Sequence, residues 1–92
     1  MNKNDVPAPI PDVIWRVPDD SAVLVSPEGG QVTILNEVGT MIWSLIDGQN
    51  SLGEIAQQVV DQYDVDIVQA HMDVEQFLSL LDGRHLILWE NK

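Results

Sequence analysis

The sequence predicts an α+β fold in which an N-terminal three-stranded antiparallel β-sheet is followed by three helices. Two observations carry this prediction. Short runs rich in β-branched residues, separated by proline and glycine, fill residues 13–35, as strands and their turns do. Apolar residues then recur every three or four positions from residue 36 to residue 83, which is the period of amphipathic helices. A chain of 92 residues has room for one domain with one modest core.

The strands are predicted from residue type and from the turns between them. Residues 13–17 form a β-branched and aromatic run that stops at Pro18, which favours a short first strand. Residues 22–26 and 31–35 flank the turn Pro27-Glu28-Gly29-Gly30, whose glycines accept positive φ. This pattern is typical of a hairpin.

Each predicted helix begins with a side chain that can cap it. Asn36 is expected to cap the first helix, Ser51 and Glu54 form a capping box for the second, and Asp66 is expected to cap the third. The helices should turn their apolar stripes toward the core: Val38, Met41, Ile42, Leu45 and Ile46 in the first, Leu52, Ile55, Ala56, Val59 and Tyr63 in the second, and Ala70, Val74, Phe77, Leu78 and Leu81 in the third.

The two ends of the chain are expected to lie outside this body. Residues 1–12 contain Pro7, Pro9 and Pro11, which predicts a flexible, proline-rich arm on which the fold does not depend. The third helix should stop at Gly83, and residues 86–89 should form a closing strand or an extended tail. The domain is therefore predicted to cover residues 13–89, with a tail at 90–92.

Charge excludes two classes of partner. The net charge is −11, and the four basic residues leave no positive side chain between Val17 and Gly83, where twelve acidic residues lie. Such a surface repels nucleic acid and anionic membranes. It also suggests a complementary basic patch on whatever protein or peptide the domain meets.

Cysteine is absent, so neither disulfides nor thiolate chemistry is available. No segment has the apolar length of a membrane span, and the first residues lack the apolar core of a signal peptide. We therefore expect a cytoplasmic protein, either a monomer or a weak dimer.

A strand, a hairpin and three helices make a winged-helix-like arrangement with the sheet placed first. Short motifs in this order resemble the PqqD family, also called RiPP recognition elements: Pro27-Glu28-Gly29, Leu35-Asn36, Ile42-Trp43, Asp47-Gly48, Ser51 with Glu54-Ile55, Tyr63-Asp64, and Asp73-Val74 with Phe77-Leu78 and Leu81. The resemblance covers about residues 13–87. It departs at Arg84-His85, where the family commonly has a glycine.

The resemblance implies a non-enzymatic peptide chaperone without a cofactor. Such a protein captures the leader of a ribosomally made precursor peptide and presents it to a modifying enzyme, often a radical S-adenosylmethionine protein. In the family the leader adds as a strand to the third strand, beside the third helix. Here that edge consists of Gln31, Val32, Thr33, Ile34 and Leu35.

The residue types at these positions suit strand addition. Residues 31–35 contain no proline or lysine that would block an exposed edge, and Val32 and Ile34 form an apolar row at period two. The third helix carries Met72, Gln76 and Leu80 outside its core stripe, which makes them candidates for the second wall of a groove. Two alternatives stay open: another strand or the tail covers the edge, or these helical residues pack against the first strand or the arm.

Other chemistry is poorly supported. His71 and Glu75 lie one helical turn apart, but two ligands do not make a metal site. Asp61, Asp64 and Asp66 lack the glycine and glutamate of a calcium loop and are interpreted as helix ends. We expect no catalytic, metal-binding or cofactor-binding residues.

Two rival functions remain. An acyl or peptidyl carrier protein would use Ser51 as its attachment site, although the preceding Asn50 stands where a carrier has aspartate. A winged-helix scaffold or regulator would have a protein partner, because the third helix has none of the positive residues that contact DNA. Trp43 is interpreted as a core tryptophan, with a role as a protein-contact anchor as the alternative.

Overall fold

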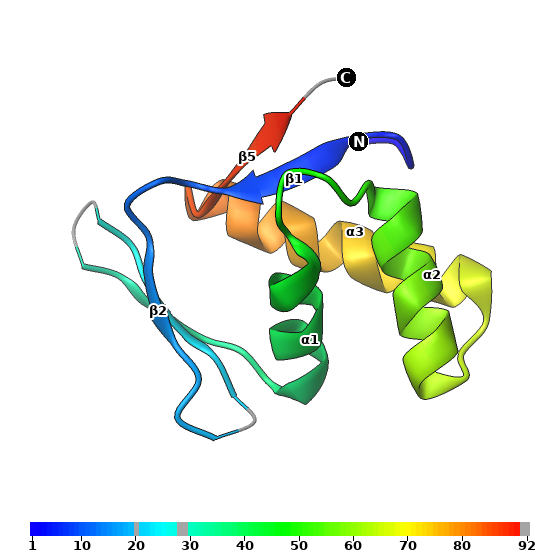
Figure 1. The fold of residues 1–92 in the computed structure, drawn as a ribbon, viewed down its shortest axis with the longest axis horizontal. Coiled ribbons are helices and arrows are strands. Elements are labelled where there is room, and N and C mark those ends of the chain that lie inside the picture. The colour runs from blue at the N-terminus through cyan, green and yellow to red at the C-terminus, as the bar shows by residue number, and fades with distance from the viewer. Residues whose placement is uncertain (20, 28–29, 91–92) are drawn as a thin grey trace.

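A computed structural model describes residues 1–19, 21–27 and 30–90. Its elements are the strands β1 (Val6–Pro9), β2 (Ile14–Arg16), β3 (Val23–Val25) and β4 (Val32–Ile34), the helices α1 (Glu37–Leu45), α2 (Leu52–Tyr63) and α3 (Ile67–Gly83), and the last strand, β5 (Ile87–Glu90). Figure 1 shows β2, β3 and β4 on one side of the molecule and the helices on the other. The predicted α+β order of sheet and helices is confirmed.

The sheet is antiparallel and has the order β2-β3-β4. Leu24, at its centre, lies opposite Trp15 on β2 and Thr33 on β4. β4 is therefore an edge strand. Gly30 has a φ of 67°, a left-handed conformation that glycine accepts without strain. Glu28 and Gly29 of the predicted hairpin turn, and Asp20 of the turn before β3, lie outside the described residues.

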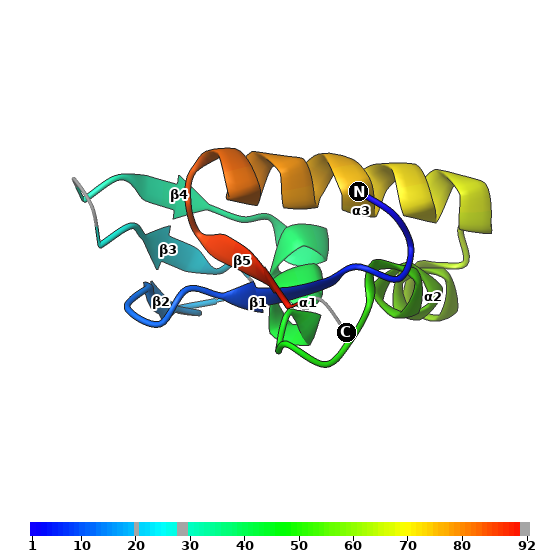
Figure 2. The same ribbon diagram turned by 90° about the horizontal axis from the view of Figure 1, so that it is seen from above.

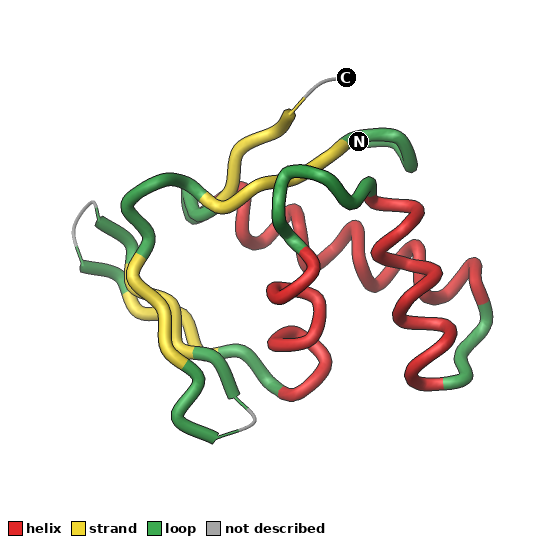
Figure 3. The backbone as a smooth tube through the Cα atoms, in the orientation of Figure 1, coloured by secondary structure: helices red, strands yellow, loops and turns green. Residues whose placement is uncertain are grey.

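The N-terminal segment is part of the fold, which corrects the prediction of a free arm. β1 pairs antiparallel with β5, in a two-stranded sheet separate from the other (Figure 3). On the opposite side, the carbonyl oxygens of Pro7 and Asp5 accept hydrogen bonds from the N–H groups of Gly48 and Leu52, at 3.0 and 2.8 Å. Since the N and O atoms of one residue point the same way in a strand, the missing N–H of Pro7 faces away from β5. Proline therefore does not interrupt this ladder.

Replacing a buried residue of β1 is expected to destabilise the whole domain. Val6 is 5% exposed, and we expect Val6→Asp to lower the free energy of unfolding by about 2 kcal/mol or more, because it buries an unpaired carboxylate. Asn4→Asp adds the same charge at an exposed position and should change stability by less than about 0.5 kcal/mol. Urea unfolding measures both, and equal stability of the two variants would restore the free-arm interpretation.

The helix caps are those that the sequence predicts. The Asn36 side chain accepts from the Gly39 N–H, the Ser51–Glu54 capping box forms in both directions, and Asp66 accepts from two amides of the first turn of α3. α3 extends through Gly83 as expected, but the left-handed residue that ends it is His85, with a φ of 57°. His85 therefore occupies the left-handed position after a helix that glycine favours. Arg84-His85 is also where the sequence departs from the pattern of the family that it resembles.

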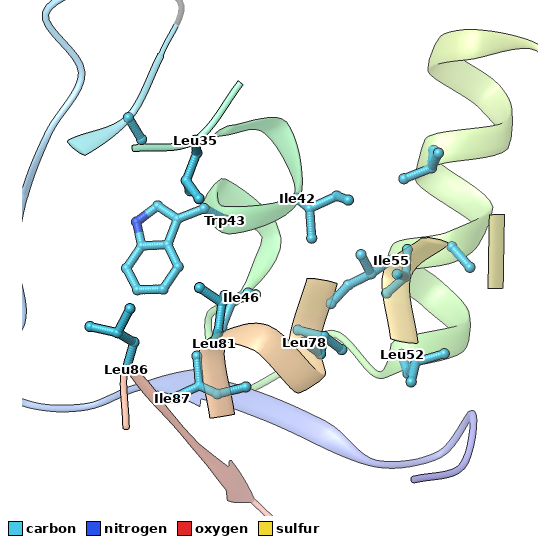
Figure 4. Packing of buried hydrophobic residues seen from close by; sticks show 14 of the residues in the cluster. Leu35, Ile42, Trp43, Ile46, Leu52, Ile55, Leu78, Leu81, Leu86 and Ile87 are labelled. Atoms are coloured by element: carbon cyan, nitrogen blue, oxygen red, sulfur yellow. The ribbon is translucent and has the colours of Figure 1, made fainter. Parts of the chain in front are cut away.

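One hydrophobic core joins the sheet to the three helices. Sixteen buried residues form it, and among them Leu24, Leu52, Leu78 and Leu81 are fully buried. Trp43 extends from α1 between Leu35 and Leu86 (Figure 4) and is 3% exposed. Its ring makes a T-shaped contact with the Trp15 ring, with centroids 6.1 Å apart. The interpretation of Trp43 as a core residue is confirmed.

Candidate functional site

The outer edge of β4 has no neighbouring strand in the described part of the chain. β4 pairs only with β3, and the closing strand β5 pairs with β1 instead. Leu35 donates its N–H to the Ala22 oxygen at 2.8 Å, and Gln31 accepts from the Ser26 N–H at 2.9 Å. Odd-numbered residues of this strand therefore direct their backbone groups toward β3. By the alternation of an antiparallel ladder, Val32 and Ile34 direct theirs to the open edge.

The side chains of β4 divide between its two faces. Thr33 is 4% exposed and points toward the body of the protein, while Val32 and Ile34 are 55% and 72% exposed on the outer face of the sheet. The apolar row predicted from the sequence is present but faces outward. Leu35, 4% exposed, belongs to the core, and Gln31 is exposed.

The outward row continues across the sheet. Ile14 is 60% exposed and shares the outer face with half-buried Val23 and Val25. An apolar hollow lies on this side of the sheet, lined by Ile14, Trp15, Arg16, Pro18, Val23 and Val25. A peptide strand added to β4 would enlarge this sheet face and place alternate side chains on it.

The C-terminal end of α3 lies next to β4, and the helix extends away from that strand over α1 (Figure 2). Met72 and Leu80 are 50% and 45% exposed, and Gln76 is exposed. Each step of four residues turns the side chain by about 40° around the helix. Met72 therefore points away from the core, whereas Leu80 lies on the side of half-buried Phe77.

The side of α3 that carries Phe77 is the one near the start of α1. The position that a Cβ would occupy at Gly39 lies 3.1 Å from Phe77 Cε1, so α1 begins directly against the Phe77 ring. Leu80, three residues beyond Phe77, is thus turned toward the α1 and β4 side. None of Met72, Gln76 and Leu80 is buried beneath another element, so all three are available at the surface of α3.

Arg84 connects the end of α3 to β4, and the sequence did not single it out as a site residue. Its Nη1 donates to Thr33 Oγ1 at 2.8 Å, which ties the end of α3 to the inner face of β4. The only sequence signal was the departure from the family pattern at Arg84-His85. A contact across 51 positions of the chain has no local signature.

The comparisons with known proteins agree with this architecture. Residues 21–87 match the family model described as coenzyme PQQ synthesis protein D (PqqD). The chain belongs to the PqqD family. It is also 31% identical over 68 residues to proteins named PqqA binding protein from Xanthomonas oryzae and Xanthomonas campestris, a match that covers 74% of this chain and 72% of theirs.

Solved structures show the same PqqD fold. TbiB1 in complex with the TbiA(beta) leader peptide superimposes with a TM-score of 0.81 and 29% identity, over 87% of this chain and 93% of TbiB1. The PqqD truncation of Methylobacterium extorquens PqqCD, described as a functional, stand-alone RiPP recognition element, gives 0.79 and 26%, over 96% and 94%. Lasso peptide synthetase B1 complexed with the leader peptide shares the fold at 0.80 and 21% identity, over 89% and 96%.

Within this PqqD-family domain, each of the three aspartates considered as calcium ligands has a local structural role in or beside a helix. Asp61 accepts from the Gln57 side chain, Asp64 ends α2 with a left-handed φ of 54°, and Asp66 caps α3. The described residues contain no group of three or more His, Asp or Glu side chains arranged to hold a metal ion. No helix within them is long and apolar enough to cross a membrane.

Ser51 also has a structural role as the N-cap of α2. The carrier-protein alternative does not require this role. Its hydroxyl accepts from the Glu54 N–H at 3.2 Å, and its own N–H donates to Glu54 Oε1 at 2.8 Å. We expect Ser51→Ala to lower the free energy of unfolding by about 1 kcal/mol and to leave peptide affinity unchanged. Ser44→Ala, on an exposed part of α1, is the control, with little effect on either.

Thermal unfolding measures the change in stability of these variants, and intact-mass analysis of the wild-type protein shows whether Ser51 is modified. A mass increase on Ser51 after incubation with a phosphopantetheinyl transferase and coenzyme A would favour the carrier alternative instead.

Proposed function

We propose that this protein binds the leader of a ribosomally made precursor peptide as an added strand on β4 and presents it to a modifying enzyme. The observation that carries the proposal is the free edge at Val32 and Ile34, whose outward N–H and C=O groups face no other strand among the described residues. Strand addition uses such groups for affinity and the neighbouring side chains for selectivity. Relatives named for binding PqqA, and similar structures that hold leader peptides, support the same function.

The proposed binding residues are Gln31, Val32, Thr33, Ile34 and Leu35 on the strand and Met72, Gln76 and Leu80 on α3. Val32 and Ile34 would supply backbone contacts, and Leu35 would anchor the strand in the core. Leu80 would meet side chains of the peptide near β4, since it turns toward the side of α3 that carries Phe77. Gln76, which lies between Leu80 and Met72 around the helix, would offer a polar contact beside it. Met72 would meet the part of the peptide that runs farther along α3.

The protein would act in the cytoplasm, without catalysis or a cofactor of its own. Its modifying partner would be a radical S-adenosylmethionine enzyme. The net charge of −11 favours a partner or a leader with a basic surface.

A winged-helix regulator that reads DNA is disfavoured by a specific feature. α3, the helix that would enter the groove, contains no lysine or arginine between Ile67 and Gly83. DNA affinity depends on several such contacts with phosphate.

An amide NMR titration tests the proposal. The ligand is a synthetic leader from a short precursor reading frame beside the gene for this protein. We expect shifts at 31–35 and along the exposed face of α3. Shifts confined to α1 and α2 would contradict the proposal.

A further inference from the structure

Arg84 is a cation without an anionic partner in a strongly acidic protein. The chain has fifteen acidic and four basic residues, yet within the described residues no carboxylate oxygen lies within 4.0 Å of the Arg84 guanidinium. The residue is only half-buried. A partly desolvated guanidinium is most stable when its donors meet carboxylate oxygens.

Most of the hydrogen-bond donors of Arg84 have no protein partner among the described residues. A guanidinium has five N–H donors, and the only side-chain bond of Arg84 in the described structure runs from Nη1 to Thr33 Oγ1. That bond holds the group beside the middle residue of β4, at the inner face of the strand, where the inward side chains of a strand added to β4 would lie. The remaining donors form a planar fork, which matches the geometry of a carboxylate.

Strand addition needs such a contact for a physical reason. Backbone hydrogen bonds along an edge are the same for every register, and a slip of one residue moves each peptide side chain to the other face. β4 spans only three residues, so few side-chain contacts are available to oppose a slip. A single charged contact at a fixed position would select one register.

We propose that Arg84 receives an aspartate or glutamate side chain of the bound peptide and thereby sets the register of the added strand. The proposal rests on the function proposed above. It predicts a leader with one essential acidic residue, because the rest of the domain surface repels further negative charge.

The alternative is that Arg84 only braces α3 against β4 through Thr33. The two roles separate experimentally. Arg84→Gln removes the charge. Loss of a brace would weaken the binding of acidic peptides and of their amide counterparts equally, whereas loss of a carboxylate contact would weaken only the binding of acidic peptides. Arg16→Gln makes the same charge change on the exposed strand β2, which β3 separates from the open edge.

The experiment is an mRNA-display selection of random 12-residue peptides on the wild-type protein and on the two variants. We expect the wild-type and Arg16→Gln proteins to enrich Asp or Glu at one position relative to flanking apolar residues. Arg84→Gln should lose that preference. Urea unfolding of each variant establishes that it is folded.

A double-mutant cycle then measures the contact. For an enriched peptide, replacing the acidic residue by its amide should weaken binding to the wild-type protein by about 10- to 100-fold, the range for a charge-assisted hydrogen bond. The same replacement should change binding to Arg84→Gln by less than about twofold.

Enriched peptides without an acidic position, or an equal loss for acid and amide peptides on Arg84→Gln, would overturn the role of Arg84 and leave strand addition standing. If no enriched peptide shifts the amides of residues 31–35, both the proposed function and this inference fail.

Discussion

Ile34→Pro is expected to weaken leader binding by about tenfold or more while leaving the domain folded. The Ile34 N–H faces the open edge of β4, so proline removes a donor that an added strand would use without removing a bond to β3. The ring also occupies space that the incoming strand needs. Loss of one backbone hydrogen bond costs about 1 kcal/mol, and the steric conflict adds to that. Isothermal titration calorimetry with a leader peptide measures the change.

The matched control for this prediction is Ile34→Thr, which keeps the amide and the branched Cβ. We expect a loss of less than about threefold, because the 72% exposed side chain contributes less than the backbone. Thr33→Pro offers the opposite contrast, since residue 33 is in the register that bonds to β3 and proline there should disrupt the sheet. Unimpaired binding by Ile34→Pro would exclude strand addition at this edge.

Leu78→Ala and Leu80→Ala are expected to have opposite effects, although they lie two residues apart on α3. Leu78 is 0% exposed in the core, so its truncation should lower the free energy of unfolding by about 2–5 kcal/mol. The total for a domain of this kind is about 5–15 kcal/mol. The fraction that remains folded should bind the leader with unchanged affinity, because Leu78 does not reach the groove.

Leu80 is 45% exposed, and its truncation should change the stability of the domain by less than about 0.5 kcal/mol. If Leu80 lines the groove, Leu80→Ala should weaken leader binding by about 3- to 30-fold, the equivalent of burying part of an apolar side chain. Urea unfolding and calorimetry on both variants test the pair. Equal leader affinity for Leu80→Ala and the wild-type protein would remove Leu80 from the site.

The features that the sequence predicts correctly are local. Asn36, Ser51 with Glu54, and Asp66 cap the helices as expected, because capping bonds join residues two or three positions apart. The helix stripes are also found in the core, with Leu78 and Leu81 fully buried. A period of three to four residues determines which face a helix buries, whatever lies opposite.

The errors concern strands and their partners. Proline-rich residues 1–12 were expected to be free, yet Val6–Pro9 forms a strand against Ile87–Glu90, at the other end of the chain. The prolines show which backbone N–H donors are missing. They do not show which side of the strand faces its partner. The outward direction of Val32 and Ile34 was equally open, since alternation distinguishes two faces without identifying the buried one.

By itself, the sequence determined the element order, the caps, the apolar stripes, the acidic character and the motif spacing of a PqqD-family domain. All of these depend on residues close together in the chain or on composition alone. Only the tertiary structure decided that β5 pairs with β1 and leaves β4 open, and that Arg84 meets Thr33. Those features depend on which distant segments compete for the same edge, and that competition is settled by the packing of the whole chain.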